Sequence, residues 1–159
     1  MKNIISIIVL AFIFIGFATF FLNRNVTEQK PKQPTDSTIA IIHKTPTCGC
    51  CGVYSSYMKK EGYHVEINDM ADLSGIKQSL GVPSELESCH TSEIGGYVVE
   101  GHIPNEAIER LLSEKPNIKG IGMAGMPTGS PGMPGPKTND FVIYEITNEN
   151  TRGEIFMTI

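Results

Sequence analysis

Residues 39–62 read IAIIHKTPTCGCCGVYSSYMKKEG, and three of the chain's four cysteines lie at the centre of this stretch, in Cys48-Gly49-Cys50-Cys51-Gly52. The apolar residues before the motif are continuous, which predicts a buried strand over 38–43. Residues 53–62 have a helical period that ends at a glycine, a typical C-cap. The cysteines are therefore expected in a strand-to-helix turn, where the helix dipole favours thiolate over thiol.

The rest of the chain predicts further alternation of strands and helices. The expected elements are a strand over 63–68, a helix from Asp72 or Ser74 to Leu80, a third strand within 95–101, a helix over 105–114, and strands over 141–147 and 154–159. Residues 118–136 are rich in glycine and proline, which predicts neither a helix nor an internal strand there. This order indicates an α/β fold, a thioredoxin-like sandwich with a mixed sheet and a C-terminal β-hairpin.

The N-terminus predicts an apolar helix over 1–22, because residues 4–22 carry no charge. Its length is near the roughly 20 residues of a membrane span, which favours an anchor. Residues 16–18 (Gly-Phe-Ala) offer the small side chains that a signal peptidase requires, so a cleaved signal peptide remains the alternative. Residues 23–37 predict a flexible tether to a domain over 38–159. In either case we expect an exported domain, in the periplasm or at the extracytoplasmic face of the membrane.

The charge of the chain excludes one class of partner. The net charge is −4, and lysine and arginine form no cluster along the sequence. Nucleic-acid-binding proteins usually carry clustered basic residues, because these neutralise phosphates. We therefore expect no nucleic-acid partner, and contact with a membrane only through residues 1–22.

The cysteines allow two kinds of chemistry. Cys48 and Cys51 have the Cys-x-x-Cys spacing of thiol–disulfide oxidoreductases. Cys50 has no role in such an enzyme, but it adds a ligand to a metal cluster. Cys89, followed by His90, precedes the predicted third strand and is expected to face the other three cysteines. Structural disulfides, for example between Cys89 and either Cys48 or Cys51, are the alternative in an oxidising compartment.

The identity of a bound metal depends on the remaining donors. His102 follows the predicted third strand and is expected at the same end of the sheet, whereas His43 and His64 are assigned to surface or strand positions. The glycine- and proline-rich segment contains three methionines, Met123, Met126 and Met133. They are either gap-filling hydrophobic residues or thioether ligands. Thiolate, imidazole and thioether together favour Cu(I), whereas zinc has little use for methionine.

Four motifs resemble the CopG-type family of exported metal-binding proteins, long catalogued as a domain of unknown function and often encoded with copper-resistance genes. The resemblance covers roughly residues 39–159, and four motifs in one order make it specific. The motifs are Thr47-Cys48-Gly49-Cys50-Cys51-Gly52, Ser88-Cys89-His90-Thr91, Gly95-Gly96-Tyr97-Val98-Val99-Glu100-Gly101-His102-Ile103-Pro104 and Gly125-Met126-Pro127-Thr128-Gly129-Ser130-Pro131-Gly132-Met133.

The resemblance implies a thioredoxin-like fold that holds copper in the thiolates of Cys48, Cys50, Cys51 and Cys89. His90, His102 and the three loop methionines would be further partners. The family is also similar to thiol oxidoreductases, and redox activity of the bound copper has been proposed for it.

These observations support three hypotheses. The first is an extracytoplasmic copper-binding protein of copper tolerance, which holds more than one Cu(I) ion and exchanges copper with a donor or acceptor protein. Its site would cycle between thiolate–copper and disulfide states, so that the thiols reduce Cu(II) as they bind it. The second is a thiol–disulfide oxidoreductase in which Cys48 attacks and Cys51 resolves. The third is a structural disulfide domain used for protein contacts. Whether the protein is an enzyme stays open, because copper or thiol–disulfide oxidoreductase activity fits the first two.

Overall fold

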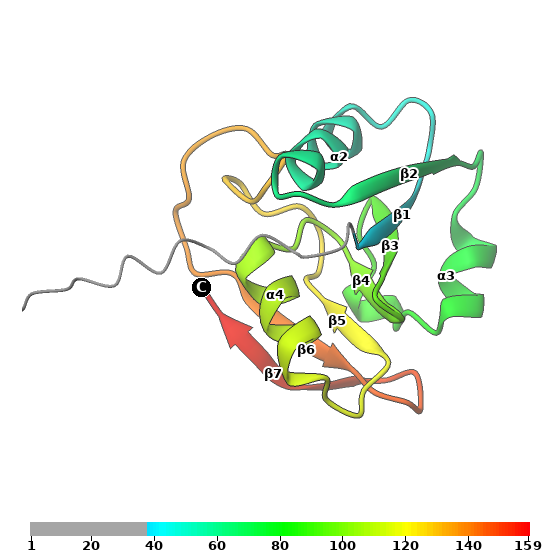
Figure 1. Ribbon diagram of the computed structural model, residues 1–159, viewed down its shortest axis with the longest axis vertical. Coiled ribbons are helices and arrows are strands. Elements are labelled where there is room, and N and C mark those ends of the chain that lie inside the picture. The colour runs from blue at the N-terminus through cyan, green and yellow to red at the C-terminus, as the bar shows by residue number, and fades with distance from the viewer. Residues whose placement is uncertain (1–37) are drawn as a thin grey trace, which may run out of the picture. The chain divides into compact units, whose positions relative to one another are not determined.

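The computed structural model describes residues 38–159, so the predicted apolar helix and tether lie outside the described residues. Within this range, seven strands form one mixed sheet of order β2-β1-β3-β4-β5-β6-β7 (Figure 1). The strands are β1 (Ile39–Lys44), β2 (His64–Asp69), β3 (His90–Ile94), β4 (Tyr97–Glu100), β5 (Gly120–Gly122), β6 (Val142–Ile146) and β7 (Arg152–Thr158). The helices are α2 (Gly49–Lys60), α3 (Ser74–Leu80) and α4 (Asn105–Glu114), with a 3-10 turn η1 (Ser84–Leu86). In this part of the chain, no helix has the length and apolarity needed to cross a membrane.

The mixed α/β class is confirmed. β1 pairs with β2 in parallel, as expected for the first strand–helix–strand unit. β6 and β7 form the predicted antiparallel C-terminal hairpin. The bounds of α4 agree with the prediction, and α3 ends at Gly81, whose φ of 71° gives the left-handed C-cap expected of a glycine.

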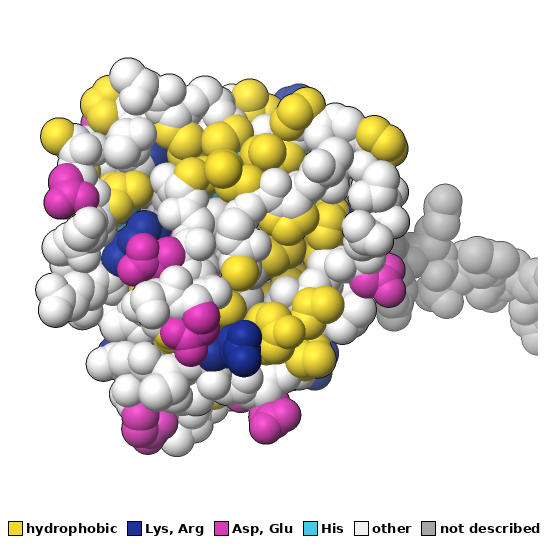
Figure 2. Space-filling model, turned by 180° about the vertical axis from the view of Figure 1, so that it is seen from behind, with side chains coloured by type: hydrophobic (Ala, Val, Ile, Leu, Met, Phe, Trp, Pro, Cys, Tyr) yellow, Lys and Arg dark blue, Asp and Glu magenta, His cyan; other side chains and the backbone are white. Residues whose placement is uncertain are grey.

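Two hydrophobic clusters cover the two faces of the sheet. The larger cluster joins α2 and α4 to the strands, through Tyr54 and Met58 from α2 and Ile108 and Leu111 from α4. The smaller cluster contains Val98 and three residues outside β4, Val82, Leu86 and Ile146, with Leu80 of α3 packed against it. On the face shown in Figure 2, hydrophobic side chains gather over one part of the surface, whereas Asp and Glu lie mostly toward its edge.

β3 was not predicted, although it is an internal strand of the sheet, between β1 and β4. It pairs antiparallel with both β1 and β4, and the turn to β4 uses Gly95 and Gly96, both with positive φ. Four of its five residues are polar, which hid it from a search for apolar runs. The predicted third strand is therefore β4, the fourth in the sequence.

β5 contradicts the prediction that residues 118–136 contain no internal strand. This three-residue strand lies between β4 and β6. Gly120 permits the pairing, because a Cβ at this position would collide with the backbone of Val98. A residue type that argued against a strand is thus, at Gly120, what allows the backbones of β4 and β5 to approach.

α2 begins at Gly49, four residues before the predicted start at residue 53. Cys48 is the N-cap, and Cys50 and Cys51 lie in the first helical turn rather than in a preceding turn. The helix therefore carries the cysteines itself, and its geometry sets the directions in which their sulfur atoms point.

Candidate metal centre

The first turn of α2 brings three sulfur atoms together. Cys50 Sγ lies 3.5 Å from Cys48 Sγ. Cys48 and Cys51 are joined by a disulfide in this structure, and Cys50 and Cys89 are free thiols. Cys51 is fully buried, whereas Cys48 and Cys50 are half-buried. Of these three sulfur atoms, those of Cys48 and Cys50 are therefore the more accessible.

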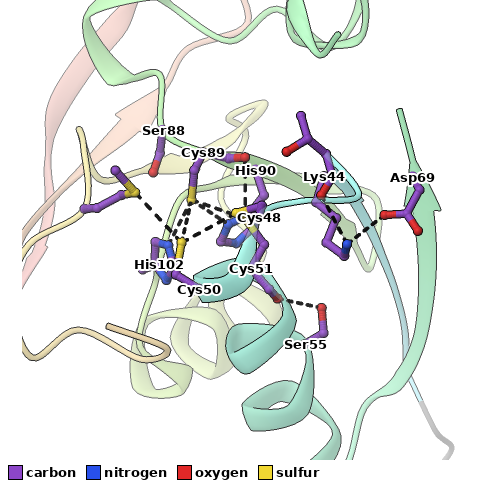
Figure 3. The surroundings of a disulfide bond; sticks show 12 residues. Lys44, Cys48, Cys50, Cys51, Ser55, Asp69, Ser88, Cys89, His90 and His102 are labelled. Atoms are coloured by element: carbon purple, nitrogen blue, oxygen red, sulfur yellow. Dashed lines mark hydrogen bonds and ion pairs between the residues drawn. A yellow bond between two sulfur atoms is a disulfide. The ribbon is translucent and has the colours of Figure 1, made fainter. Parts of the chain in front are cut away.

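Cys89 completes the cluster from the residue before β3 (Figure 3). Its Sγ lies 3.4 Å from Cys51 Sγ and 3.7 Å from Cys50 Sγ. All four sulfur atoms lie within 4.8 Å of one another. The expectation that Cys89 faces the other cysteines is confirmed, because the antiparallel pairing of β3 with β1 brings its start beside the N-terminus of α2.

Two buried imidazoles adjoin the same sulfur atom. His102 Nε2 lies 3.0 Å from Cys89 Sγ, and His90 Nδ1 lies 3.5 Å from it. His102 Nδ1 lies 2.7 Å from the carbonyl oxygen of Pro131, so it must donate, and Nε2 keeps its lone pair. Cys89, His90 and His102 thus form a second ligand group that shares one residue with the four cysteines.

The three methionines have different surroundings. Met126 is 49% exposed, and its Sδ lies 4.0 Å from Cys50 Sγ. Met133 lines a shallow pocket with Cys50, Val53 and Pro134. Met123 is buried in the larger hydrophobic cluster, which fits the gap-filling interpretation. The structure therefore brings Met126 to the cysteines and places Met133 in a pocket that Cys50 also lines.

The other two histidines lie in strands, as interpreted from the sequence. His43 is buried in β1, where its Nε2 lies 2.9 Å from Glu93 Oε1 and its Nδ1 lies 3.1 Å from Asn68 Nδ2. The side chain of His64 in β2 is 63% exposed. Neither belongs to a metal-ligand group among the described residues.

The chain is similar to proteins of known structure. Residues 86–133 match the family described as "Protein of unknown function, DUF411". A solved structure titled "Copper resistance protein copG- Form 2" has 32% sequence identity and a TM-score of 0.72, over 78% of this chain and 99% of that one. A second, titled "Copper resistance protein copG- Form 1", has 32% identity and a TM-score of 0.71, over 78% and 98%. The chain belongs to the CopG family. No curated protein sequence matches it.

The donors of this CopG-family site fit a soft metal ion. Burial lowers the pKa of His90 to about 3, with smaller effects of His102 and Lys77, and burial also lowers the pKa of His102. Both imidazoles are therefore neutral near pH 7 and have lone pairs to offer. The buried Nε2 of His90 has no hydrogen-bond partner within residues 38–159. Thiolate, neutral imidazole and thioether are together the ligands of soft metals.

Cys89 lies before β3 and not in the strand-to-helix turn, so the dipole effect expected for the cysteines of that turn does not concern it. Burial raises the pKa of Cys89 to about 12, with a further contribution from Cys50. In the metal-free protein this residue is therefore a thiol, which can donate to His102 Nε2. A bound metal ion must displace that proton.

The residues that support the ligands of the CopG-family site were not predicted from the sequence. Lys77 and Glu100 form a buried ion pair, and Pro131 orients His102. Glu100 carries the only signal that was available, because it is a charged residue directly after the apolar run Tyr97-Val98-Val99. A backbone carbonyl such as that of Pro131 leaves no trace in the sequence.

Proposed function

We propose that this protein is an extracytoplasmic copper-binding protein of copper tolerance. It binds Cu(I) through the thiolates of Cys48, Cys50, Cys51 and Cys89, with His90, His102 and Met126 as further ligands. The observation that carries the proposal is the position of Cys89, whose sulfur belongs both to the four-cysteine group and to the Cys-His-His group. The titles of the two similar structures support the choice of copper.

The number of donors supports more than one copper ion. Four sulfur atoms and two imidazole nitrogens exceed what one ion uses in a tetrahedral site. A thiolate has several lone pairs and can bridge two ions. Cys89 is the residue placed to do so, because it is the one member common to both groups.

The proposal includes redox activity. When two thiols join as the Cys48–Cys51 disulfide, two electrons and two protons leave the sulfur atoms. Those electrons reduce two Cu(II) ions to Cu(I), and the protons pass to solvent. Disulfide formation also removes two thiolates, so the oxidised protein retains only Cys50 and Cys89 as thiol ligands.

The exposed side of the site supports exchange of copper with a donor or acceptor protein. Met126 is 49% exposed, and its Sδ lies 4.0 Å from Sγ of the half-buried Cys50, so an incoming ligand can reach a thioether that adjoins the cysteine cluster. The proposal also assigns roles to the N-terminal residues. Residues 1–22 would export the domain, as a membrane anchor or a cleaved signal peptide, and residues 23–37 would be its tether.

A Cu(I) titration of the reduced full-length chain in detergent tests the proposal. With a Cu(I) chelator as competitor, we expect more than one ion per chain and a lower number for Cys50→Ser. Lys59→Ser is the control, because it adds the same side chain at an exposed position of the same helix, in the last turn and away from the cysteines. A chain that binds no copper under these conditions would refute the function.

A thiol–disulfide oxidoreductase is the second candidate, and one observation favours it. The Cys48–Cys51 disulfide lies at the N-terminus of α2, with Cys48 half-buried and Cys51 fully buried. Thiol–disulfide exchange uses an accessible thiol that attacks the substrate and a second, buried thiol that resolves the mixed disulfide, and this is the arrangement of Cys48 and Cys51. It also supports a thioredoxin-like assignment of the fold. Insulin reduction that survives Cys50→Ser, together with no copper uptake, would favour this candidate.

A further inference from the structure

Next to the metal centre, one buried carboxylate accepts hydrogen bonds from three groups. Glu100 is fully buried at the end of β4. Its Oε1 accepts hydrogen bonds from Lys77 Nζ at 2.5 Å and from the backbone N–H of Ser88 at 2.6 Å. Its Oε2 accepts from Thr91 Oγ1 at 2.6 Å, and Lys77 also donates to Thr91 at 2.9 Å. The cluster joins α3, β3, β4 and the loop before Cys89.

Stability alone gives little reason for this ion pair. Removing two charges from water costs several kcal/mol per ion, and apolar residues of similar volume are often as stable or more stable. What an apolar residue at position 100 cannot provide is an acceptor for the N–H of Ser88. That bond fixes the residue directly before Cys89 in place.

The same loop connects to two other ligands of the site. Ser88 Oγ donates to the carbonyl oxygen of Gly125 at 2.5 Å, and the next residue is Met126. Gly101 follows Glu100 and packs so closely that a Cβ would lie 2.8 Å from the Met123 carbonyl oxygen and 2.9 Å from Ser88 Cβ. Position 102 is the histidine beside Cys89. One carboxylate thus links the segments that supply the cysteine, the histidine and the exposed thioether.

We propose that the buried Lys77–Glu100 pair positions Cys89 in the metal centre through the backbone of Ser88, and holds the Met126 loop against the site through the Ser88 hydroxyl. Lys77 and Glu100 are positioning residues and touch no metal. The inference rests on the proposed function for its copper readout, so its test also needs a readout without copper.

Phenylarsine oxide supplies the copper-free readout. It condenses with two neighbouring thiols, forming two As–S bonds and releasing one water. In the oxidised protein Cys48 and Cys51 are joined, so the reagent reports the free pair Cys50 and Cys89, whose sulfur atoms lie 3.7 Å apart. Capture depends on the placement of Cys89 relative to α2.

The decisive variant makes the whole cluster apolar, as Lys77→Met with Thr91→Val and Glu100→Leu. We expect a melting temperature close to that of the parent, because no buried charge is left unpaired. We also expect slower arsenical capture and a Cu(I) affinity about 10- to 100-fold lower, the usual loss when the support of a ligand is removed. Glu100→Gln, a milder change, should move both binding readouts in the same direction. Glu114→Gln is the control, because it breaks an exposed ion pair with Arg110 on α4.

The results separate the two proposals. If the apolar variant captures the arsenical and binds Cu(I) as the parent does, the pair is only structural and the inference is overturned. If the apolar variant folds but loses arsenical capture, the position of Cys89 depends on the Lys77–Glu100 pair. That conclusion holds even if the parent protein binds no copper. If the apolar variant does not fold, Glu100→Gln decides by the same two readouts.

Discussion

At the residue scale, close contacts hold single side chains of the site in place. Gly132 shows how closely the glycine- and proline-rich loop packs on α2. Its φ is 87°, and a Cβ there would lie 2.9 Å from both the Cys50 carbonyl oxygen and the Tyr54 nitrogen. The preceding residue, Pro131, offers the carbonyl that orients His102. The loop therefore contributes to the site through its backbone as well as through Met126.

Replacing Gly132 by alanine should weaken copper binding. The added methyl forces the loop away from α2, so His102 loses its partner and Cu(I) affinity falls by about tenfold. Gly96→Ala is the matched control, because Gly96 has the same φ of 87° and open space around a Cβ. It should cost about 1 kcal/mol of stability from backbone strain and leave affinity unchanged. Equal affinities for the two variants in a chelator competition would contradict this role of the loop.

At the element scale, local patterns predicted the elements whose residues follow a simple period. α4 has an apolar face and was predicted at its observed bounds. β3 and β5 were not predicted, because their residues are set by contacts with neighbouring strands and not by a local hydrophobic period. Polar residues of β3 such as Thr91 bond to the next strand, and Gly120 of β5 permits a close approach. Such requirements come from tertiary contacts and have no local signal.

A tyrosine at the contact between α2 and α4 should make the protein less stable at alkaline pH. Burial raises the pKa of Tyr57 to about 12, and its hydroxyl accepts the N–H of Asn105 at the start of α4. In the unfolded chain a tyrosine ionises near pH 10. The contribution of Tyr57 to stability is therefore complete below about pH 10 and is lost as the pH rises to about 12.

Chemical denaturation between these pH values measures the effect. The free energy of unfolding should fall with rising pH, and Tyr57→Phe should make the slope smaller while lowering stability at pH 8. A slope that Tyr57→Phe leaves unchanged would place the responsible group elsewhere.

At the scale of the whole molecule, the site is a product of topology. Its ligands come from α2, from the start of β3, from the residues after β4 and from the loop before β6. The sequence allowed the convergence of Cys89 on the other cysteines to be predicted, because the strand-to-helix turn and the Cys-His pair could be placed at one end of a sheet. The Lys77–Glu100 pair could not be predicted, because its members are 23 positions apart and no sequence pattern connects the glutamate after an apolar run with a lysine of α3.

Because the ligands come from distant segments of the chain, we expect copper to stabilise the reduced fold. A metal that binds the folded state and not the unfolded one adds stability that grows with the free metal concentration. We expect the melting temperature of the reduced protein to rise with buffered Cu(I), and Cys89→Ser to remove most of that rise. Because Cys50 and Cys51 share one helical turn, a rise that Cys89→Ser leaves intact would indicate that metal binds to α2 alone.

The most direct test of the central claim is the copper content of the reduced full-length chain after Cu(I) loading against a competing chelator. We expect more than one ion per chain, and a larger loss for Cys89→Ser than for Cys50→Ser, because Cys89 belongs to both ligand groups. A Cys89→Ser chain that retains the full copper content would contradict the claim.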